Sequence, residues 1–459
     1  MAVENKLESF IANPRIALWK LTIPMMFGLF VNSIYILVDT YFVGSMLGED
    51  GTSALSALGY VMPFYFIIMG ITFGISSGTT AVIAQYIGQN NHSSTSLAAQ
   101  NSLVIAVLVS IINIFFTYWF GSDAIEFQGA NPKVLSLALE YFYIMAYGSV
   151  FLIFSIFLRG ILIGEGESIV PMVALGTGTI LNIILDPFFI KHYGIGGAAY
   201  ATMISHIVVI FIFLYFIFIK KITYSNLNFQ DFNLNFKIWK KIFKLGIPSS
   251  ISMLIMSFGL FIMNTILVED SHVAGYNLAN RIENFATLAL ISLASSQVTI
   301  IGMFYGAKKY YLIKPMIRYA TVWAMIIGGL FSILSLLFID KVAPLFFPSN
   351  STLDLAMKDN AIKSTIQYYN YMAFAYPFIG LTMVSSRALQ AINIAWPMIL
   401  ITFTRVIILQ CSLTYLFIVV LDYEDVAWAW YSISISCIIA GIIAYLMRLY
   451  FVNKLKEIQ

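Results

Sequence analysis

The chain has 459 residues, of which 60% are hydrophobic and only 10% are charged. A soluble protein of this size carries about 25% charged residues, so the composition excludes a water-soluble globular protein and indicates that lipid is the solvent. The formal net charge of +3 is small, and we expect the lipid bilayer, and no nucleic acid, as the large partner of this chain.

Twelve apolar runs follow one another along the sequence. Each is long enough for the roughly 20 helical residues that cross a bilayer. A β-barrel would instead need alternating segments of about ten residues, so the runs predict an all-α membrane protein with twelve transmembrane helices. The runs lie at 16–44, 54–84, 97–120, 134–158, 168–190, 197–219, 241–267, 273–304, 314–338, 361–388, 395–420 and 426–451.

The lysines and arginines predict how these spans are oriented. Because twelve is even, both termini lie on one side of the membrane, and most basic residues of the connections fall on that side. Basic residues are enriched in cytoplasmic connections, so we expect both termini to be cytoplasmic. The lysines that fall on the opposite side are Lys133, Lys191, Lys341, Lys358 and Lys363.

The second half of the chain repeats motifs of the first half. The repeated motifs are "WKLTIPMM" (19–26) and "FKLGIPSS" (243–250), "QYIGQNN" (85–91) and "MFYGAKK" (303–309), and "LRGILIGEGESIVPM" (158–172) and "SRALQAINIAWPM" (386–398). The offsets between the copies are 224, 218 and about 227 residues, so they are nearly constant. The chain therefore contains two copies of a six-helix unit.

An even number of spans in each copy makes this a parallel repeat, which transporters use to build a central cavity between two halves. We predict an N-terminal six-helix lobe over 1–219, a cytoplasmic linker over 220–240 and a C-terminal six-helix lobe over 241–459. The two lobes form pseudo-symmetric bundles around the central cavity. A channel or a membrane enzyme built by duplication remains the alternative to a transporter at this point.

Two acids lie inside the spans of the first lobe. Asp39 occurs in the run "IYILVDTYFVG", where a carboxylate costs roughly 2.5–3.5 kcal/mol at a helix centre. Asp39 aligns with Met263 in the second copy, and Asp186 of span five has no acidic counterpart either. An acid kept in only one copy indicates a function rather than a role in folding the unit. The alternative for Asp39 is a structural role, in which it caps a helix kink or bonds Tyr35.

The surroundings of the two acids predict an oxygen-rich site. Asp39 and Asp186 both lie near the outer third of spans that run outward. Asn182 precedes Asp186 by four residues and shares its helix face, while Pro187 is expected to open a kink. Thr202 in span six adds a hydroxyl, and Tyr35 lies on the same face as Asp39. Such a site suits a proton or a small hard cation.

Three further features are weaker candidates. Pro24 weakens the hydrogen-bond ladder of span one and gives that helix a place to bend. Glu283 in span eight is a candidate for a second cation site, with an ion pair to Arg281 as the structural alternative. Arg405 in span eleven has no evident partner in the sequence.

With these residues in place, the sequence resembles the multidrug and toxic compound extrusion (MATE) family, within the multidrug/oligosaccharidyl-lipid/polysaccharide flippase superfamily. The resemblance covers nearly the whole chain. It rests on the twelve spans in two halves, on "IPMMFGLFVNSIYILVDTYFVG" (23–44) and on "LNIILDPFF" (181–189). It is nearest to the DinF-like prokaryotic branch, which keeps its key acids in the N-terminal half.

The resemblance implies a secondary active antiporter in a prokaryotic inner membrane. H⁺ or Na⁺ enters as an amphipathic, often cationic, compound leaves by alternating access. We expect a monomer without a cofactor, without catalytic residues, and with no metal beyond Na⁺. The residues implied in the cation site are Asp39, Asn182, Asp186, Thr202 and the carbonyl group of Ala198, with Tyr35 beside them.

Two other functions remain in competition. A flippase of the same superfamily for lipid-linked oligosaccharides or peptidoglycan precursors would have to bind pyrophosphate with several bases inside the spans. Arg281 and Arg405 are the only bases well inside the spans, away from their ends, which argues against it. A membrane enzyme would need a catalytic cluster; the sequence contains no HExxH, and its GxSxG match, "GISSG" (74–78), lies inside the apolar run 54–84. We therefore favour a transporter over an enzyme.

Overall fold

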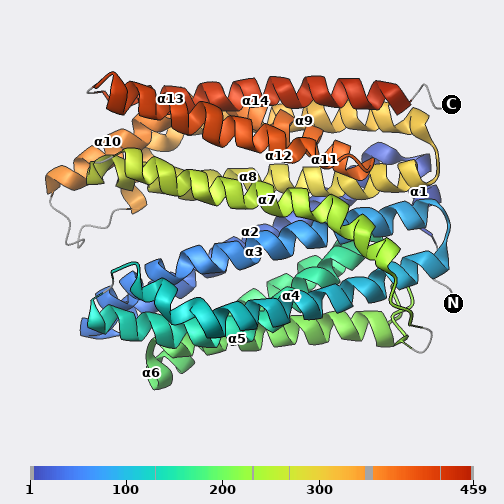
Figure 1. Ribbon diagram of the computed structural model, residues 1–459, viewed down its shortest axis with the longest axis horizontal. Helices are drawn as coiled ribbons and strands as arrows, with labels where there is room; N and C mark the ends of the chain where they lie inside the picture. The colour runs from blue at the N-terminus through green and yellow to red at the C-terminus, as the bar shows by residue number, and fades with distance from the viewer. Residues whose placement is uncertain are drawn as a thin grey trace. The chain divides into compact units, whose positions relative to one another are not determined.

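The computed structural model describes residues 5–129, 131–229, 232–267, 269–346, 355–423 and 425–455. These residues form helices and no strand (Figure 1), which confirms the all-α prediction. Three π-helical segments, η2 (Tyr215–Ile219), η5 (Thr404–Cys411) and η6 (Leu416–Val420), continue neighbouring α-helices. The α-helices are α1 (Leu7–Ala12), α2 (Pro14–Met46), α3 (Gly51–Gly88), α4 (His92–Glu126), α5 (Pro132–Gly164), α6 (Ile169–Leu214), α7 (Phe236–Ile266), α8 (Asp270–Gly306), α9 (Tyr310–Val342), α10 (Leu355–Met372), α11 (Tyr376–Ala391), α12 (Pro397–Phe403), α13 (Ser412–Tyr415) and α14 (Ala427–Lys454).

Ten of the described helical segments are long and apolar enough to cross a membrane. One of them, Ile169–Ile219, has 51 residues and would be about 75 Å long if straight, against a hydrocarbon core of about 30 Å. Its backbone leaves the helical conformation at Tyr193 and Gly194, so it makes two spans. The predicted span at 361–388 is interrupted between α10 and α11. Counting this broken span, the twelve predicted membrane helices are confirmed.

The chain divides into two compact units. Unit 1 comprises Met1–Ser250 together with Gly302–Lys308, and unit 2 comprises Ile251–Ile301 together with Lys309–Gln459. The division between the units falls inside α7 and near the end of α8, so the first four turns of α7 belong to unit 1. Each unit is described by itself below.

Helix α5 is the central helix of unit 1. It packs against α3, α4 and α6, while α2 packs along α6 (Figure 1). The most apolar window of α5 is 72% buried, against 22–28% for α2, α3, α4 and α6. Phe157, Ile161 and Leu162 are completely or almost completely buried. Because lipid supplies no hydrophobic drive for helix association, this close packing is what holds the helices together.

The repeated motif at 85–88 and 303–306 makes a reciprocal contact in unit 1. A methyl group on Gly88 would overlap the carbonyl oxygen of Met303, and one on Gly306 would overlap the carbonyl oxygen of Gln85. These are equivalent positions of the two copies, at the constant offset of 218 residues. The glycines therefore allow the ends of α3 and α8 to touch backbone to backbone, as small residues do between membrane helices.

The segment that follows η2 is anchored to unit 1 by side chains of α4 and of the α5–α6 connection. The Gln100 amide donates to the carbonyl groups of Asn226 (3.1 Å) and Asn228 (2.7 Å). The buried Glu165 carboxylate accepts hydrogen bonds from the backbone amides of Tyr224 (2.8 Å) and Ser225 (3.0 Å) and from the Ser225 hydroxyl. Burial raises the pKa of Glu165 to about 7, more than these hydrogen bonds lower it.

Unit 2 is organised around aromatic side chains. Helix α11 packs against α9 and α14. The largest fully buried side chains of unit 2 are those of Tyr368, Tyr369, Tyr376 and Trp430. The rings of Tyr368 and Trp430 lie edge to face with centroids 5.4 Å apart, which is a favourable aromatic arrangement.

Candidate functional site

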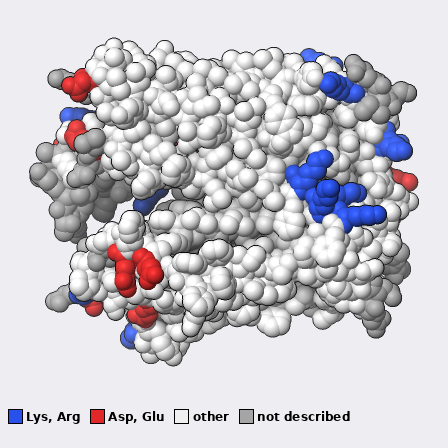
Figure 2. Space-filling model, in the orientation of Figure 1, with Lys and Arg blue, Asp and Glu red and all other residues white. Residues whose placement is uncertain are grey.

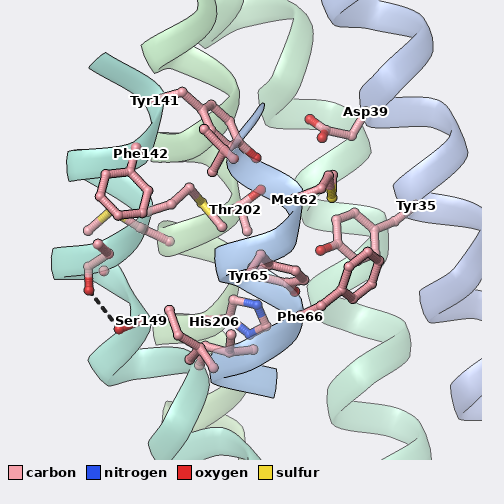
Figure 3. Close-up of a pocket in the computed structure, with 17 residues that line it drawn as sticks. Tyr35, Asp39, Met62, Tyr65, Phe66, Tyr141, Phe142, Ser149, Thr202 and His206 are labelled. Atoms are coloured by element: carbon pink, nitrogen blue, oxygen red, sulfur yellow. Dashed lines mark hydrogen bonds between the residues drawn. The ribbon is translucent and has the colours of Figure 1, made fainter. Parts of the chain in front are cut away.

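Asp39 projects from α2 into a cavity of unit 1. Its side chain is 8% exposed, and its Oδ1 atom has no hydrogen-bond donor in the described part of the chain. Tyr35 lies one turn earlier and lines the same cavity (Figure 3). No hydrogen bond joins Asp39 to Tyr35 among the described contacts. Among the described residues, Oδ1 of this carboxylate thus lines the cavity without a hydrogen-bond partner.

The remaining predicted ligands come together because α6 reverses direction. Gly194 has φ +59°, a left-handed conformation that glycine adopts without a steric penalty. Past this break, Thr202 returns beside Asn182, whose amide nitrogen lies 3.4 Å from the Thr202 hydroxyl. The same amide donates to Asp186 Oδ1 at 3.1 Å. Residues 20 positions apart would be about 30 Å apart in one straight helix, so the break assembles the site.

Asp186 is the deepest of these groups. It is completely buried, and its Oδ2 atom and Oδ1 of Asn182 lack a hydrogen-bond donor among the described residues. Asp186 and Asp39 are close enough to interact electrostatically, and Tyr141 of α5 lies within range of both. With Asp39 Oδ1, three inward-facing oxygens therefore have no partner. Buried acceptors without donors are costly, and a bound proton or cation would relieve that cost.

The cavity beside Asp39 contains about 930 Å³ of space outside the protein atoms and is partly open. Its walls combine flexible thioethers with aromatic rings, and no lysine or arginine lines it in the described part of the chain. The residues shown in Figure 3 that form these walls include Met62, Tyr65, Phe66, Tyr141 and Phe142.

His206 is a site residue that the sequence did not reveal. It lines the large cavity and also a smaller neighbouring one of about 280 Å³, which includes Asn182 and Thr202. Its Nδ1 atom is buried without a hydrogen-bond partner among the described residues. Figure 3 places the ring beside Tyr65, one helical turn beyond Thr202. The four-residue spacing from Thr202 was the available signal, because it puts both side chains on one helix face.

The other predicted residues of unit 1 are placed as follows. Ala198 is fully buried in the part of α6 that follows the break. Helix α2 continues through Pro24 and α6 continues through Pro187. The backbone break in α6 lies at Tyr193 and Gly194, not at the proline.

Glu283 lies in unit 2, in α8. Its Oε2 atom accepts a hydrogen bond of 2.8 Å from the Tyr368 hydroxyl. Arg281 is exposed and forms no salt bridge with Glu283 among the described residues. Arg405 interacts electrostatically with Glu283, and its guanidinium lies 3.5 Å from the Cys437 sulfur. The charged neighbour of Glu283 is therefore Arg405 rather than Arg281.

The donor set of unit 1 limits what the site can hold. The described residues contain no cluster of three or more His, Cys, Asp or Glu side chains that could hold a metal ion. Two carboxylates, an amide oxygen and a hydroxyl are hard oxygen donors, which suit a proton or a small hard cation rather than a transition metal.

Relatives with assigned names resemble the chain over most of its length. A "Probable multidrug resistance protein YoeA" of Bacillus subtilis (strain 168) is 24% identical over 83% of this chain and 82% of its own length. The "Multidrug export protein MepA" of Staphylococcus aureus (strain NCTC 8325 / PS 47) is 27% identical over 64% of this chain and 65% of its own length.

Solved structures resemble the whole fold. A MOP superfamily transporter from Pyrococcus furiosus Vc1 (DSM3638), for which a binding pocket of reverse polarity suggests a different function, is 27% identical. Its TM-score is 0.92, over 99% of this chain and 100% of that one. A multidrug resistance MATE family transporter in an outward-facing conformation is also 27% identical, with a TM-score of 0.91 over 100% of both chains.

The model of the MatE family matches residues 24–188 and 248–416, which include most of both repeated halves. This match confirms the resemblance found in the sequence and the expectation of a transporter rather than an enzyme. Members of this family need no cofactor. The chain is a multi-pass membrane transporter that belongs to the MATE family.

Proposed function

We propose that the protein exports amphipathic, often cationic, compounds in exchange for H⁺ or Na⁺. The observation that carries this proposal is the position of Asp39, a buried carboxylate with a free oxygen on the wall of a large apolar cavity. A negative group on an aromatic and methionine-rich wall suits a cation with an apolar body. The names of the relatives, which refer to multidrug resistance and export, support the same cargo class.

The coupling ion binds at Asp39 and Asp186 in this proposal. The electrostatic repulsion between two neighbouring carboxylates is relieved when one proton or one Na⁺ binds and cancels part of their charge. Asn182, Thr202 and the Ala198 carbonyl group complete the oxygen ligands. A cation therefore favours the conformation with the contracted cavity, and cationic cargo favours the conformation with bare carboxylates. Cation and cargo therefore favour different conformations, and each lowers the affinity of the protein for the other by the same factor.

The exchange is a cycle of alternating access. An ion bound from outside drives the cargo out, and release of the ion on the inside restores the carboxylates for the next cargo molecule. Helix α2, which contains Pro24, is the element that responds to neutralisation of Asp39, since proline removes one hydrogen bond of its ladder. Glu283 of unit 2 is a second, weaker candidate for ion binding.

The protein works as a monomer in a prokaryotic cell membrane, with both termini in the cytoplasm. The distribution of basic residues supports this orientation. The charges of unit 1 support the same orientation, since basic residues gather over the beginning of α7 and acidic residues gather at the opposite end of the helices (Figure 2). The composition and the membrane family support the location.

A flippase for lipid-linked sugars is the alternative. Its cargo carries pyrophosphate, which needs arginine or lysine side chains in the cavity. The described lining of the unit 1 cavity contains an acid and no lysine or arginine. This polarity favours a cationic cargo over a pyrophosphate.

Transport in proteoliposomes tests the proposal. A cationic dye is loaded, and either a proton gradient or a sodium gradient is imposed while dye movement is followed. We expect one of the two gradients to drive export by the wild type, and neither to drive export by Asp39→Asn inserted at an equal level. Asp123→Asn, which makes the same chemical change at an exposed position outside both cavities, serves as the control substitution. Gradient-driven export by Asp39→Asn at the wild-type rate would overturn the proposal.

A further inference from the structure

The beginning of α7 presents a row of lysines on one helix face. Lys237, Lys240, Lys241 and Lys244 are all exposed, and their spacing of three, four and seven residues places them along a single stripe. The buried residues between them, Ile238 and Ile242, lie on the opposite side of the helix. Figure 2 shows lysines gathered over this part of α7 as a compact basic patch, and we call these four residues the lysine stripe.

The positive charge of the lysine stripe is not neutralised within the described part of the protein. Lys241 donates a hydrogen bond of 3.0 Å to the Tyr86 hydroxyl, and its ammonium lies 4.7 Å from the centre of the Tyr86 ring, so its partner is uncharged. None of the four lysines appears in a salt bridge among the described residues. Four like charges on two turns of helix repel one another, and an external anion would relieve that repulsion.

The neighbouring side chains fix the height of the lysine stripe relative to the bilayer. Ile247, one turn beyond Lys244 on the exposed face, is apolar and 45% exposed. On the other side, Phe236 is 68% exposed and its ring lies 5.6 Å from that of Trp239, whose indole donates to Asn101. Tryptophan with an anchored polar end is typical of the membrane interface. The exposed face of α7 thus changes from lysine to apolar between Lys244 and Ile247. We place the boundary between lipid headgroups and acyl chains at this point.

We propose that the lysine stripe binds the phosphate headgroups of anionic phospholipids. The ammonium groups supply the charge, and the apolar surface beginning at Ile247 contacts the acyl chain of the same lipid. Clusters of four or more lysines beside a membrane helix attract anionic lipid in this way. A soluble phosphate compound would gain the charge contacts but not the apolar ones, so the chemistry favours a lipid.

Lipid bound there would act on a helix that joins the two units. The first four turns of α7 pack on α3, where a methyl group on Gly78 would overlap the Ile242 carbonyl oxygen. Anionic lipid would therefore hold a part of α7 that has no room to shift towards α3. In this proposal, the content of anionic lipid in the membrane acts directly on α7, the helix that leads from unit 1 into unit 2.

The test measures lipid selectivity of the full chain in phosphatidylcholine vesicles. Spin-labelled phosphatidylglycerol and spin-labelled phosphatidylcholine are compared by the fraction immobilised at the protein. We expect the wild type to prefer phosphatidylglycerol by about threefold or more, since each lysine near an anionic surface contributes a favourable interaction. Lys237→Gln, Lys240→Gln and Lys244→Gln together should abolish the preference, and the corresponding three arginine substitutions should retain it.

A matched control removes three exposed lysines elsewhere, Lys191→Gln, Lys341→Gln and Lys363→Gln, and should leave the preference unchanged. Equal immobilisation of both lipids by the wild type would overturn the proposal, as would an equal loss in the control. Glycerol 1-phosphate at millimolar concentration is expected not to compete. Displacement of the lipid by this soluble probe would show that the stripe binds phosphate without regard to the acyl chain, and would also overturn it.

Discussion

Glu165→Gln removes a buried acid that anchors the segment between the two halves. In the wild type, the Glu165 carboxylate accepts hydrogen bonds from the amides of Tyr224 and Ser225. Burial raises the pKa of this group from its usual 4.5 to about 7. The glutamine side chain has the same size and cannot titrate, but its single oxygen can accept at only one of the two positions where the carboxylate oxygens accept from Tyr224 and Ser225. The substitution therefore lowers the stability of the anchor at every pH and removes its dependence on pH.

The magnitude follows from the shift in pKa. One pKa unit corresponds to about 1.4 kcal/mol, so the change to about 7 amounts to roughly 3 kcal/mol, or a few hundred-fold in the equilibrium for opening. The anchored form retains a proton that the opened form releases between the two pKa values. The stabilisation is therefore fully present below pH 4.5 and is lost as the pH rises through about 7.

Hydrogen exchange of the peptide that contains Tyr224 and Ser225 measures this opening. After correction for the intrinsic pH dependence of exchange, the protection of these amides should fall by roughly 70-fold between pH 5 and pH 8, since part of the stabilisation is already lost at pH 5. Glu165→Gln should give protection that does not depend on pH. The control Glu167→Gln alters a neighbouring acid that pairs with Lys6, and it should keep the wild-type pH dependence. Protection that is constant or rises from pH 5 to pH 8 in the wild type would refute the reasoning.

Three further predictions concern the site and the packing. Asp186→Asn should shift the pH dependence of transport to lower pH, because Asp39 then titrates without a repelling neighbour; an unchanged pH–rate profile in an active variant would contradict the coupling. His206→Phe should weaken equilibrium binding of cargo with hydrogen-bond donors by about fivefold, from the loss of one hydrogen bond, and should leave the Na⁺ or pH dependence of binding unchanged; a lost dependence would place His206 in the ion site instead. Gly88→Ala should lower the thermal midpoint, since overpacking costs about 1–3 kcal/mol, whereas Gly176→Ala, which meets open space, should not; equal midpoints would contradict the backbone contact.

The sequence was sufficient for the helices and the acids because both are local signals. Long apolar runs predict spans whatever they pack against, and a carboxylate inside such a run is expensive wherever it lies. The same holds for Asn182 beside Asp186, since four residues fix a shared helix face. The repeat also identified Gly88 and Gly306 as equivalent positions of the two copies, but it did not predict that the helix ends carrying them touch.

Other features depend on contacts between distant residues. The partners of Glu165 lie 59 and 60 residues away, so the sequence around Glu165 gave no sign of an anchored segment. No metal-ligand spacing surrounds His206 in the sequence, and only the cavity gives it a role. The reversal of α6 falls at Gly194 rather than at Pro187, because φ +59° requires glycine, whereas membrane helices tolerate proline when neighbours satisfy the freed carbonyl group.

The central claim is that the ion at Asp39 and the cargo in the adjoining cavity favour opposite states of the protein. Equilibrium binding of a fluorescent cationic dye to the purified protein, measured while Na⁺ or pH is varied, tests it most directly. We expect wild-type affinity to fall by about fivefold or more as Na⁺ rises or as the pH falls, which is a typical coupling between two sites. In Asp39→Asn the affinity should be independent of both. Wild-type affinity that ignores both Na⁺ and pH would contradict the claim.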